Sequence, residues 1–113
     1  MTDTMTDAAR ELALYTANCA RAWRAVEHIA RNYERRIAKG TYCPTLARKG
    51  MLHPVEMAAR EYVKDHCGPS DIWHGIFAPA DRQQAADSVM SDIEAEWAVG
   101  NYWGKLKVDF PID

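Results

Sequence analysis

The chain has 113 residues, of which 48% are hydrophobic and 27% are charged, and its net charge is −2 at neutral pH. This balance is typical of one globular domain that can bury its own core, and it argues against general disorder. The sequence contains no apolar run of about 18 residues, so it predicts no membrane span. The acidic N-terminus lacks the pattern of a signal peptide, and three cysteines do not make a disulfide framework, so we expect a cytoplasmic protein.

Charge is unevenly distributed along the chain. Residues 1–69 hold 11 Lys and Arg against 8 Asp and Glu, whereas residues 70–113 hold 3 against 8. The positive charge is concentrated in residues 21–49, which hold 8 Lys and Arg against 2 acids. The simplest interpretation is a dipolar surface that keeps the protein in solution. The alternatives are a site for a polyanion and self-association of the basic end with the acidic end.

The clearest pattern is an apolar stripe with alternating steps of three and four, which predicts a helix over residues 7–39. Thr6 is the expected N-cap, and Gly40 is the expected left-handed stop. Asn18 offers an alternative, a break into helices 7–17 and 19–39, but the unbroken stripe favours one continuous helix. The stripe consists of Leu12, Tyr15, Cys19, Ala22, Val26, Ile29 and Tyr33.

A broken helix is predicted in the middle of the chain. Pro44 suits the first position of a helix, with Leu46, Ala47 and Met51 facing inward. Gly50 and His53–Pro54 interrupt the pattern, which indicates either a kink or a new helix beginning at Pro54. This second part ends at Cys67–Pro69, and its expected inward residues are Val55, Ala58 or Ala59, Tyr62 and Val63.

The last part of the chain predicts a connector over residues 70–78 and a helix over 79–99. The connector has four large apolar residues that should press onto the helices: Ile72, Trp73, Ile76 and Phe77. The inward positions of the last helix are Ala86, Val89, Ile93 and Trp97. Together the patterns predict an all-α fold, a compact bundle of about four helices with a long N-terminal helix, a broken middle helix and a C-terminal helix. We expect residues 1–113 to form one domain, with short flexible ends near residues 1–6 and 105–113.

A basic stripe lies opposite the apolar one on the first predicted helix. Its members are Arg21, Arg24, His28, Arg31 and Arg35. A solvated face is the simplest explanation, while a nucleic-acid site and a site for an acidic protein are the functional alternatives. Glu27 and Glu34 interleave with the arginines and weaken the case for nucleic acid. The four tryptophans exceed what the core strictly needs. The simplest interpretation places them in the core and in a lid over it, and the alternative is that Trp23 or Trp103 is partly exposed and anchors a partner.

Metal binding and catalysis have little support in the sequence. Five potential metal ligands lie within a short segment, namely Cys43, His53, His66, Cys67 and His74, but they lack the ligand spacing of a zinc site. Cys67 with His74 would make a nucleophile and base, yet no oxyanion hole or orienting acid accompanies them. The acids of the last helix, Asp87, Asp92, Glu94 and Glu96, are expected to face mostly outward. The sequence therefore predicts no catalytic residues, no cofactor and no metal.

Several segments together resemble a group of small helical proteins of unassigned function from phages, plasmids and environmental sequence. They are Glu11–Tyr15, Ala38–Tyr42, Ala58–Lys64, Trp73–Phe77, Arg82 and Gly100–Tyr102. The chain departs from the group at Cys43, where Asp is the usual helix cap, and at His53–Pro54, where the group has uninterrupted helix. The resemblance implies a small accessory protein of a mobile element and brings no catalytic residues.

These observations predict a non-catalytic protein that binds a macromolecular protein partner. The setting implied by the resemblance suggests an inhibitor of a host-defence complex, an argument by analogy. The predicted contacts are Arg24, Arg31 and Arg35, with Trp103 as the apolar anchor. The alternative is a regulator that binds nucleic acid through the basic face of the first helix. The sequence leaves open whether the protein is a monomer or a dimer.

Overall fold

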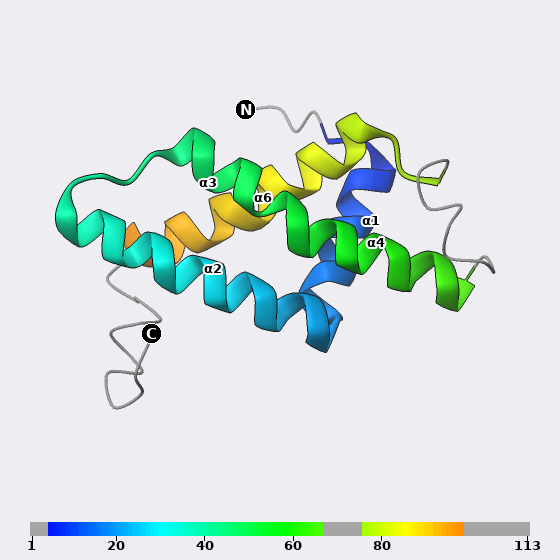
Figure 1. Ribbon diagram of the computed structural model, residues 1–113. Helices are drawn as coiled ribbons and strands as arrows, with labels where there is room; N and C mark the ends of the chain where they lie inside the picture. Colours follow the sequence, from blue (N-terminus) through cyan, green and yellow to red (C-terminus); the bar gives the residue numbers. More distant parts are fainter. Residues whose placement is uncertain (1–4, 67–75, 99–113) are drawn as a thin grey trace.

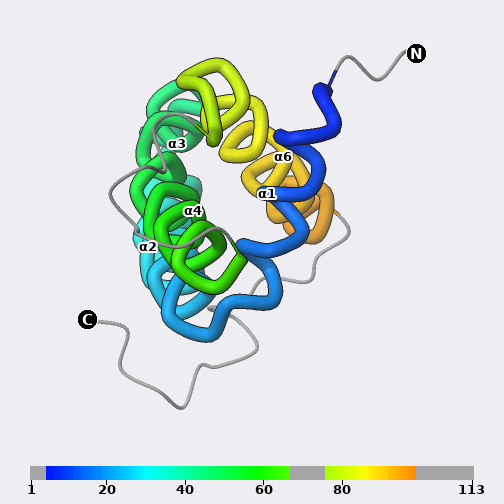
Figure 2. Tube along the Cα trace, turned by 90° about the vertical axis from the view of Figure 1, so that its right-hand side faces the viewer, coloured from blue at the N-terminus to red at the C-terminus, as the bar shows by residue number. Residues whose placement is uncertain are grey.

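The computed structural model describes residues 5–66 and 76–98, and over these residues it is helical, with no strand. Its helices are α1 (Asp7–Asn18), α2 (Ala20–Lys39), α3 (Pro44–Gly50), α4 (Leu52–His66) and α6 (Pro79–Ala98). They pack in two layers, with α2, α3 and α4 on one side and α1 and α6 on the other (Figures 1 and 2). The predicted all-α bundle is confirmed.

The prediction of one continuous helix over residues 7–39 is wrong, because the chain breaks at Cys19. This residue is extended, with φ −96° and ψ 112°. The Thr16 hydroxyl donates to the Leu12 carbonyl at 2.7 Å, and the Asn18 amide donates to the Leu14 carbonyl at 2.9 Å. Side-chain donors of this kind compete with the backbone and favour helix ends.

The break changes the direction of the chain, so that α1 crosses behind α4 while α2 runs along it (Figure 1). A straight helix over residues 7–39 would be about 50 Å long at 1.5 Å per residue. That length exceeds the 41 Å long axis of the molecule. The apolar stripe is therefore continuous in sequence, but its two halves pack on α4 in different directions, and the α1 half also packs on α6.

The predicted ends of this region are confirmed. Thr6 caps α1, because its hydroxyl oxygen accepts from the backbone N–H of Ala9 at 3.0 Å. The same hydroxyl donates to Asp81 on α6 at 2.7 Å, which ties the beginnings of the two helices together. Gly40 ends α2 in the left-handed conformation, with φ 75°. Its N–H bonds to the carbonyl of Ile37 at 3.0 Å.

The middle helix is broken as predicted, but the break lies at Met51 rather than at Pro54. Pro44 is the first residue of α3, and α3 and α4 lie nearly end to end (Figure 1). Pro54 lies in the first turn of α4, where its missing N–H costs no helical hydrogen bond. A Cβ at Gly50 would come too close to the hydroxyl of Tyr33, so any larger residue there would have to displace the end of that side chain.

The core lies between the two layers and is mostly aliphatic. All four inward positions predicted for the last helix are buried, and so are Ala47, Met51, Val55, Ala58, Ala59 and Val63 in the middle of the chain. Tyr62 is half-buried. In the long predicted stripe, Leu12, Ala22 and Val26 are buried, whereas Tyr15, Cys19, Ile29 and Tyr33 are half-buried.

Two inward predictions are wrong. Leu46 is 54% exposed, because the short α3 turns Ala47 toward the core instead. In the connector, Phe77 is buried, but its neighbour Ile76 is 41% exposed. Ile72 and Trp73 lie outside the described residues.

Candidate binding surface on α2

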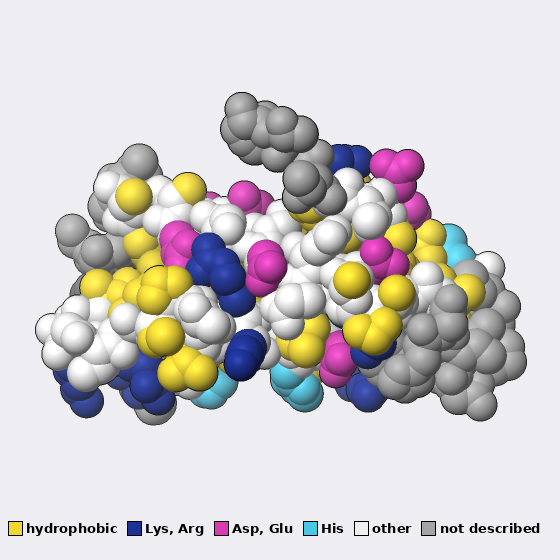
Figure 3. Space-filling model, turned by 90° about the horizontal axis from the view of Figure 1, so that it is seen from above, with side chains coloured by type: hydrophobic (Ala, Val, Ile, Leu, Met, Phe, Trp, Pro, Cys, Tyr) yellow, Lys and Arg dark blue, Asp and Glu magenta, His cyan; other side chains and the backbone are white. Residues whose placement is uncertain are grey.

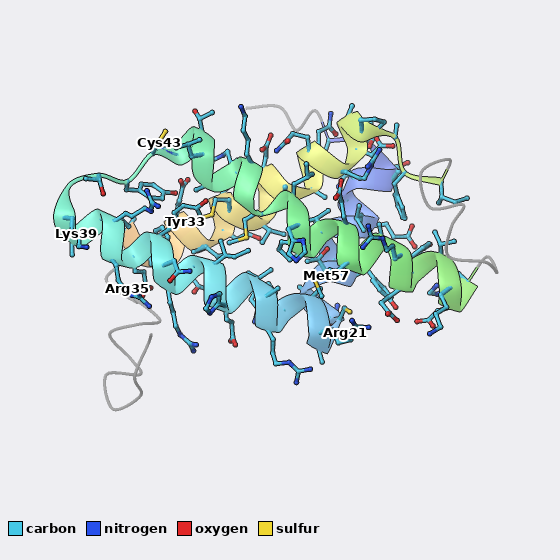
Figure 4. The ribbon with its side chains drawn as sticks, in the orientation of Figure 1. Arg21, Tyr33, Arg35, Lys39, Cys43 and Met57 are labelled. Atoms are coloured by element: carbon cyan, nitrogen blue, oxygen red, sulfur yellow. The ribbon has the colours of Figure 1, made fainter. Side chains whose placement is uncertain are left out.

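The outer side of α2 carries most of the positive charge of the N-terminal half. We define the basic face as Arg24, His28, Arg31, Arg35, Arg36 and Lys39. All are exposed except Arg31, which is half-buried. Figure 4 shows Tyr33 pointing toward α3 and Arg35 pointing to the opposite side of α2. Seen from above, Lys, Arg and His side chains follow one long edge of the molecule (Figure 3).

The three arginines predicted as partner contacts lie on one side of α2. Steps of seven and four residues, from Arg24 to Arg31 and on to Arg35, bring side chains back to nearly the same helical angle. The Nε atom of Arg31 is buried and has no hydrogen-bond partner among the described residues. Trp103, the predicted apolar anchor, lies outside the described residues.

The two acids that interleave with the basic residues are not equivalent. Glu34 is turned toward α6, where its carboxylate accepts from the indole Nε1 of Trp97 at 2.7 Å. Glu27 is half-buried on α2. At the other end of α2, Arg21 pairs with Glu61 of α4 at 3.2 Å. Because Glu34 is turned toward α6, the basic face carries less negative charge than the sequence alone indicates.

A hollow of about 390 Å³ lies at the C-terminal end of the basic face. It is lined by Asn32, Arg35, Arg36, Lys39 and Thr41. The left-handed turn at Gly40 brings Thr41 back beside the last turn of α2, where its N–H donates to the Arg36 carbonyl at 2.8 Å. The sequence predicted the turn but not the hollow, because the hollow exists only after the chain reverses.

A second, more apolar groove of about 260 Å³ lies between α1, the beginning of α2 and α6. Its most exposed large side chain is Leu14, which is 66% exposed. Trp23 also lines this groove and is half-buried, so it belongs to this groove rather than to the basic face. The groove is lined by Met5, Arg10, Ala13, Leu14, Ala17, Trp23, Ser88, Val89 and Asp92.

Glu94 is the main polar residue that the sequence analysis placed wrongly. It does not face outward but accepts from Arg48 through both oxygens, at 2.6 and 2.9 Å, and from the hydroxyl of Tyr42 at 2.5 Å. The hydrogen bonds from Arg48 hold the pKa of Glu94 below its usual range. Burial, followed by the bond to Glu94, raises the pKa of Tyr42. This network joins the 40–43 turn and α3 to α6.

A second charged pair lies inside the bundle. Arg82 is buried, and its Nη1 donates to Glu56 of α4 at 3.1 Å while its Nε donates to the carbonyl of Phe77 at 3.1 Å. Arg82 follows the helical spacing of the inward positions of α6, and that spacing was the only sequence signal for its burial. Both polar networks hold helices together and lie away from the basic face.

Two tyrosines join α1 to α4 through carboxylates. The hydroxyl of Tyr15 donates to Asp65 at 2.7 Å, and that of Tyr62 donates to Glu11 at 2.6 Å. Their rings meet edge to face, with centroids 5.3 Å apart. The hydrogen bond to Asp65, with a smaller contribution from burial, raises the pKa of Tyr15 to about 12.

Stability should therefore fall at alkaline pH. The folded state favours the neutral phenol of Tyr15, so its contribution is complete below the ordinary pKa of 10.0 and is lost as the pH rises toward about 12. Urea unfolding across this range measures the decline, and Tyr15→Phe, which cannot titrate at this position, should show a shallower one. If the free energy of unfolding falls equally steeply with pH in both proteins, the titration of Tyr15 does not contribute to the decline.

No group of three His, Cys, Asp or Glu residues is close enough to hold a metal ion within residues 5–66 and 76–98. In the segment considered for metal ligands, Cys43 is half-buried, and His53 and His66 are exposed. His66 stacks on Tyr62, with ring centroids 4.4 Å apart. Cys67 and His74 lie outside the described residues, so the pair considered as nucleophile and base is not placed.

Comparisons with known proteins gave no relative. No family model matches the chain, and neither a curated protein nor a solved structure is significantly similar to it. Among the described helices, none has the length and apolar character needed to cross a membrane.

Proposed function

We propose that the protein is a non-catalytic binding protein whose basic face docks onto an acidic surface of a protein partner. The observation that carries the proposal is the side of α2 that holds Arg24, Arg31 and Arg35, from which Glu34 is drawn away by Trp97. Arginine is favoured at protein interfaces because its planar guanidinium pairs with carboxylates through two hydrogen bonds. Trp103 stays a predicted apolar anchor.

The resemblance to small phage and plasmid proteins supplies the setting of this proposal. In that setting the protein is a cytoplasmic accessory protein of a mobile element, and the partner is a component of a host-defence complex that it inhibits. A single basic helix on a chain with a net charge of −2 suits a local acidic patch on a partner. It suits an extended polyanion less, because the negative charge of the whole molecule opposes approach.

The test is capture of proteins from a bacterial lysate by the immobilised chain, followed by binding measurements with each captured protein after purification. Arg24→Glu/Arg35→Glu should abolish binding, because two contacts become repulsive. Arg31→Gln is the third variant, since reversing a half-buried charge would also disturb folding. Lys49→Glu/Lys64→Glu is the matched control, which reverses two exposed charges on α3 and α4.

The proposal requires a protein that is lost with Arg24→Glu/Arg35→Glu and retained with the control, while circular dichroism shows unchanged helix content. Capture that survives the reversal on α2, or no captured protein that binds after purification, would refute it.

A regulator that binds nucleic acid is the second candidate, and the length of the basic face favours it. Arg24 and Lys39 mark its two ends, about 22 Å apart along the axis at 1.5 Å per residue. Such a row can follow several phosphates, and binding would then weaken steeply as salt displaces the contacts. A salt series with labelled duplex DNA, single-stranded DNA and RNA measures this, and no binding at low salt would exclude the candidate.

A further inference from the structure

The hollow at the end of α2 has a chemistry of its own, which goes beyond the proposed capture of a protein. Three of its five lining residues are cations, Arg35, Arg36 and Lys39, and Asn32 and Thr41 add neutral hydrogen-bonding groups. None of these five lining residues is acidic, and none is an aromatic or aliphatic residue. The hollow has a volume of about 390 Å³ and is open to solvent on one side.

The hollow lies at the C-terminal end of α2, and this end of a helix carries a partial negative charge that would repel an anion. This partial charge amounts to about −0.5 and is outweighed by three full positive charges within one turn. The last carbonyls also have partners in the chain. The carbonyl of Ile37 accepts from Gly40 at 3.0 Å, and that of Arg36 accepts from the N–H of Thr41 at 2.8 Å. The hollow is therefore electropositive.

One of the cations, Arg36, has an aromatic neighbour in the fold. The guanidinium of Arg36 lies 6.0 Å from the ring centroid of Tyr33. Tyr33 is itself fixed, because its hydroxyl donates to the Leu46 carbonyl at 3.1 Å and its ring meets Tyr42 edge to face. A guanidinium ordered in this way loses less conformational entropy when it binds.

We propose that this hollow binds a compact oligophosphate anion, a pyrophosphate or triphosphate group. Guanidinium groups match pairs of phosphate oxygens, and a lysine adds a point charge. The hydroxyl of Thr41 makes only a long bond of 3.4 Å to the Arg36 carbonyl, and a phosphate oxygen is a better acceptor for it. The polar lining recognises the phosphate chain, whether free or part of a nucleotide, and not a base.

Isothermal titration calorimetry of the full chain with sodium tripolyphosphate at low salt tests this proposal. Arg36→Ala/Lys39→Ala should weaken binding at least about tenfold, because two of the three cations are removed. The matched control is Arg24→Ala/Lys49→Ala, which removes two exposed cations outside the hollow and should change the affinity less than about twofold. Circular dichroism checks that both variants keep their helix content.

If the control variant weakens binding as much as the hollow variant, the proposal is overturned, because the attraction is then unspecific. The absence of measurable binding by the unaltered chain would also overturn it. ATP extends the test: equal affinity for ATP and tripolyphosphate supports recognition of the phosphate chain, whereas much tighter binding of ATP contradicts it. Since Arg24, Arg31 and Arg35 remain in the hollow variant, failure here is distinct from failure of protein capture.

Discussion

Replacing Trp97 by Ala is expected to lower the free energy of unfolding by about 4 kcal/mol, the usual cost of removing a large buried aromatic side chain. Trp97 is 5% exposed near the C-terminal end of α6. Its ring meets Tyr42 edge to face with centroids 5.6 Å apart, and its Nε1 donates to Glu34 on α2 at 2.7 Å. One side chain thus connects α2, the 40–43 turn and α6.

Urea unfolding followed by far-UV circular dichroism measures this loss. Trp97→Phe should cost less, about 2 kcal/mol, because the smaller ring keeps most of the apolar contacts but leaves a small gap and removes the donor to Glu34. Trp23→Ala is the matched control, since Trp23 is half-buried at the apolar groove and should cost less than Trp97→Ala. A loss below about 1 kcal/mol for Trp97→Ala would show that this contact does not hold α2 to α6.

Glu94→Leu is expected to destabilise the fold by about 3 kcal/mol, since it leaves the Arg48 guanidinium and the Tyr42 hydroxyl without their acceptor. This expected cost is at the lower end of the range for removing one partner of a buried ion pair. The side chains of Arg48 and Glu94 are 25% and 27% exposed, so water partly replaces the lost partner.

A double-mutant cycle separates the interaction from the loss of either residue alone. Arg48→Met/Glu94→Leu should be clearly less destabilising than the sum of the two single substitutions, because it leaves no unpaired charge. Arg21→Met/Glu61→Leu is the matched control on a more exposed pair, in which Arg21 is 67% exposed, and its coupling should be small. Additive single effects at Arg48 and Glu94 would contradict the network.

Local sequence patterns determined most of the helices and their ends. Thr6 and Gly40 act where the sequence predicted them, because capping depends on a few neighbouring residues. The break at Cys19 was recognised only as an alternative. The apolar spacing of three and four continues through the break, and periodicity alone does not reveal that the chain changes direction there.

The candidate surface was predictable in part, because the positions of residues on one helix follow from their spacing in the sequence. Helical periodicity already placed Arg24, Arg31 and Arg35 on one side of one helix, and this holds whether or not the helix is broken at Cys19. The inward turn of Glu34 was not predictable, because its partner Trp97 lies far along the chain. No local pattern reports a contact between residues so distant in sequence.

The sequence by itself determined the all-α class, the helix caps and the row of basic residues, since each depends on spacing along a single helix. Only the tertiary structure decided which acids leave that row, where Glu94 finds its partners, and that a hollow forms beside Arg36 and Lys39. Each of these features requires residues from separate elements to meet. The free energy of such contacts is fixed by packing and not by local propensity.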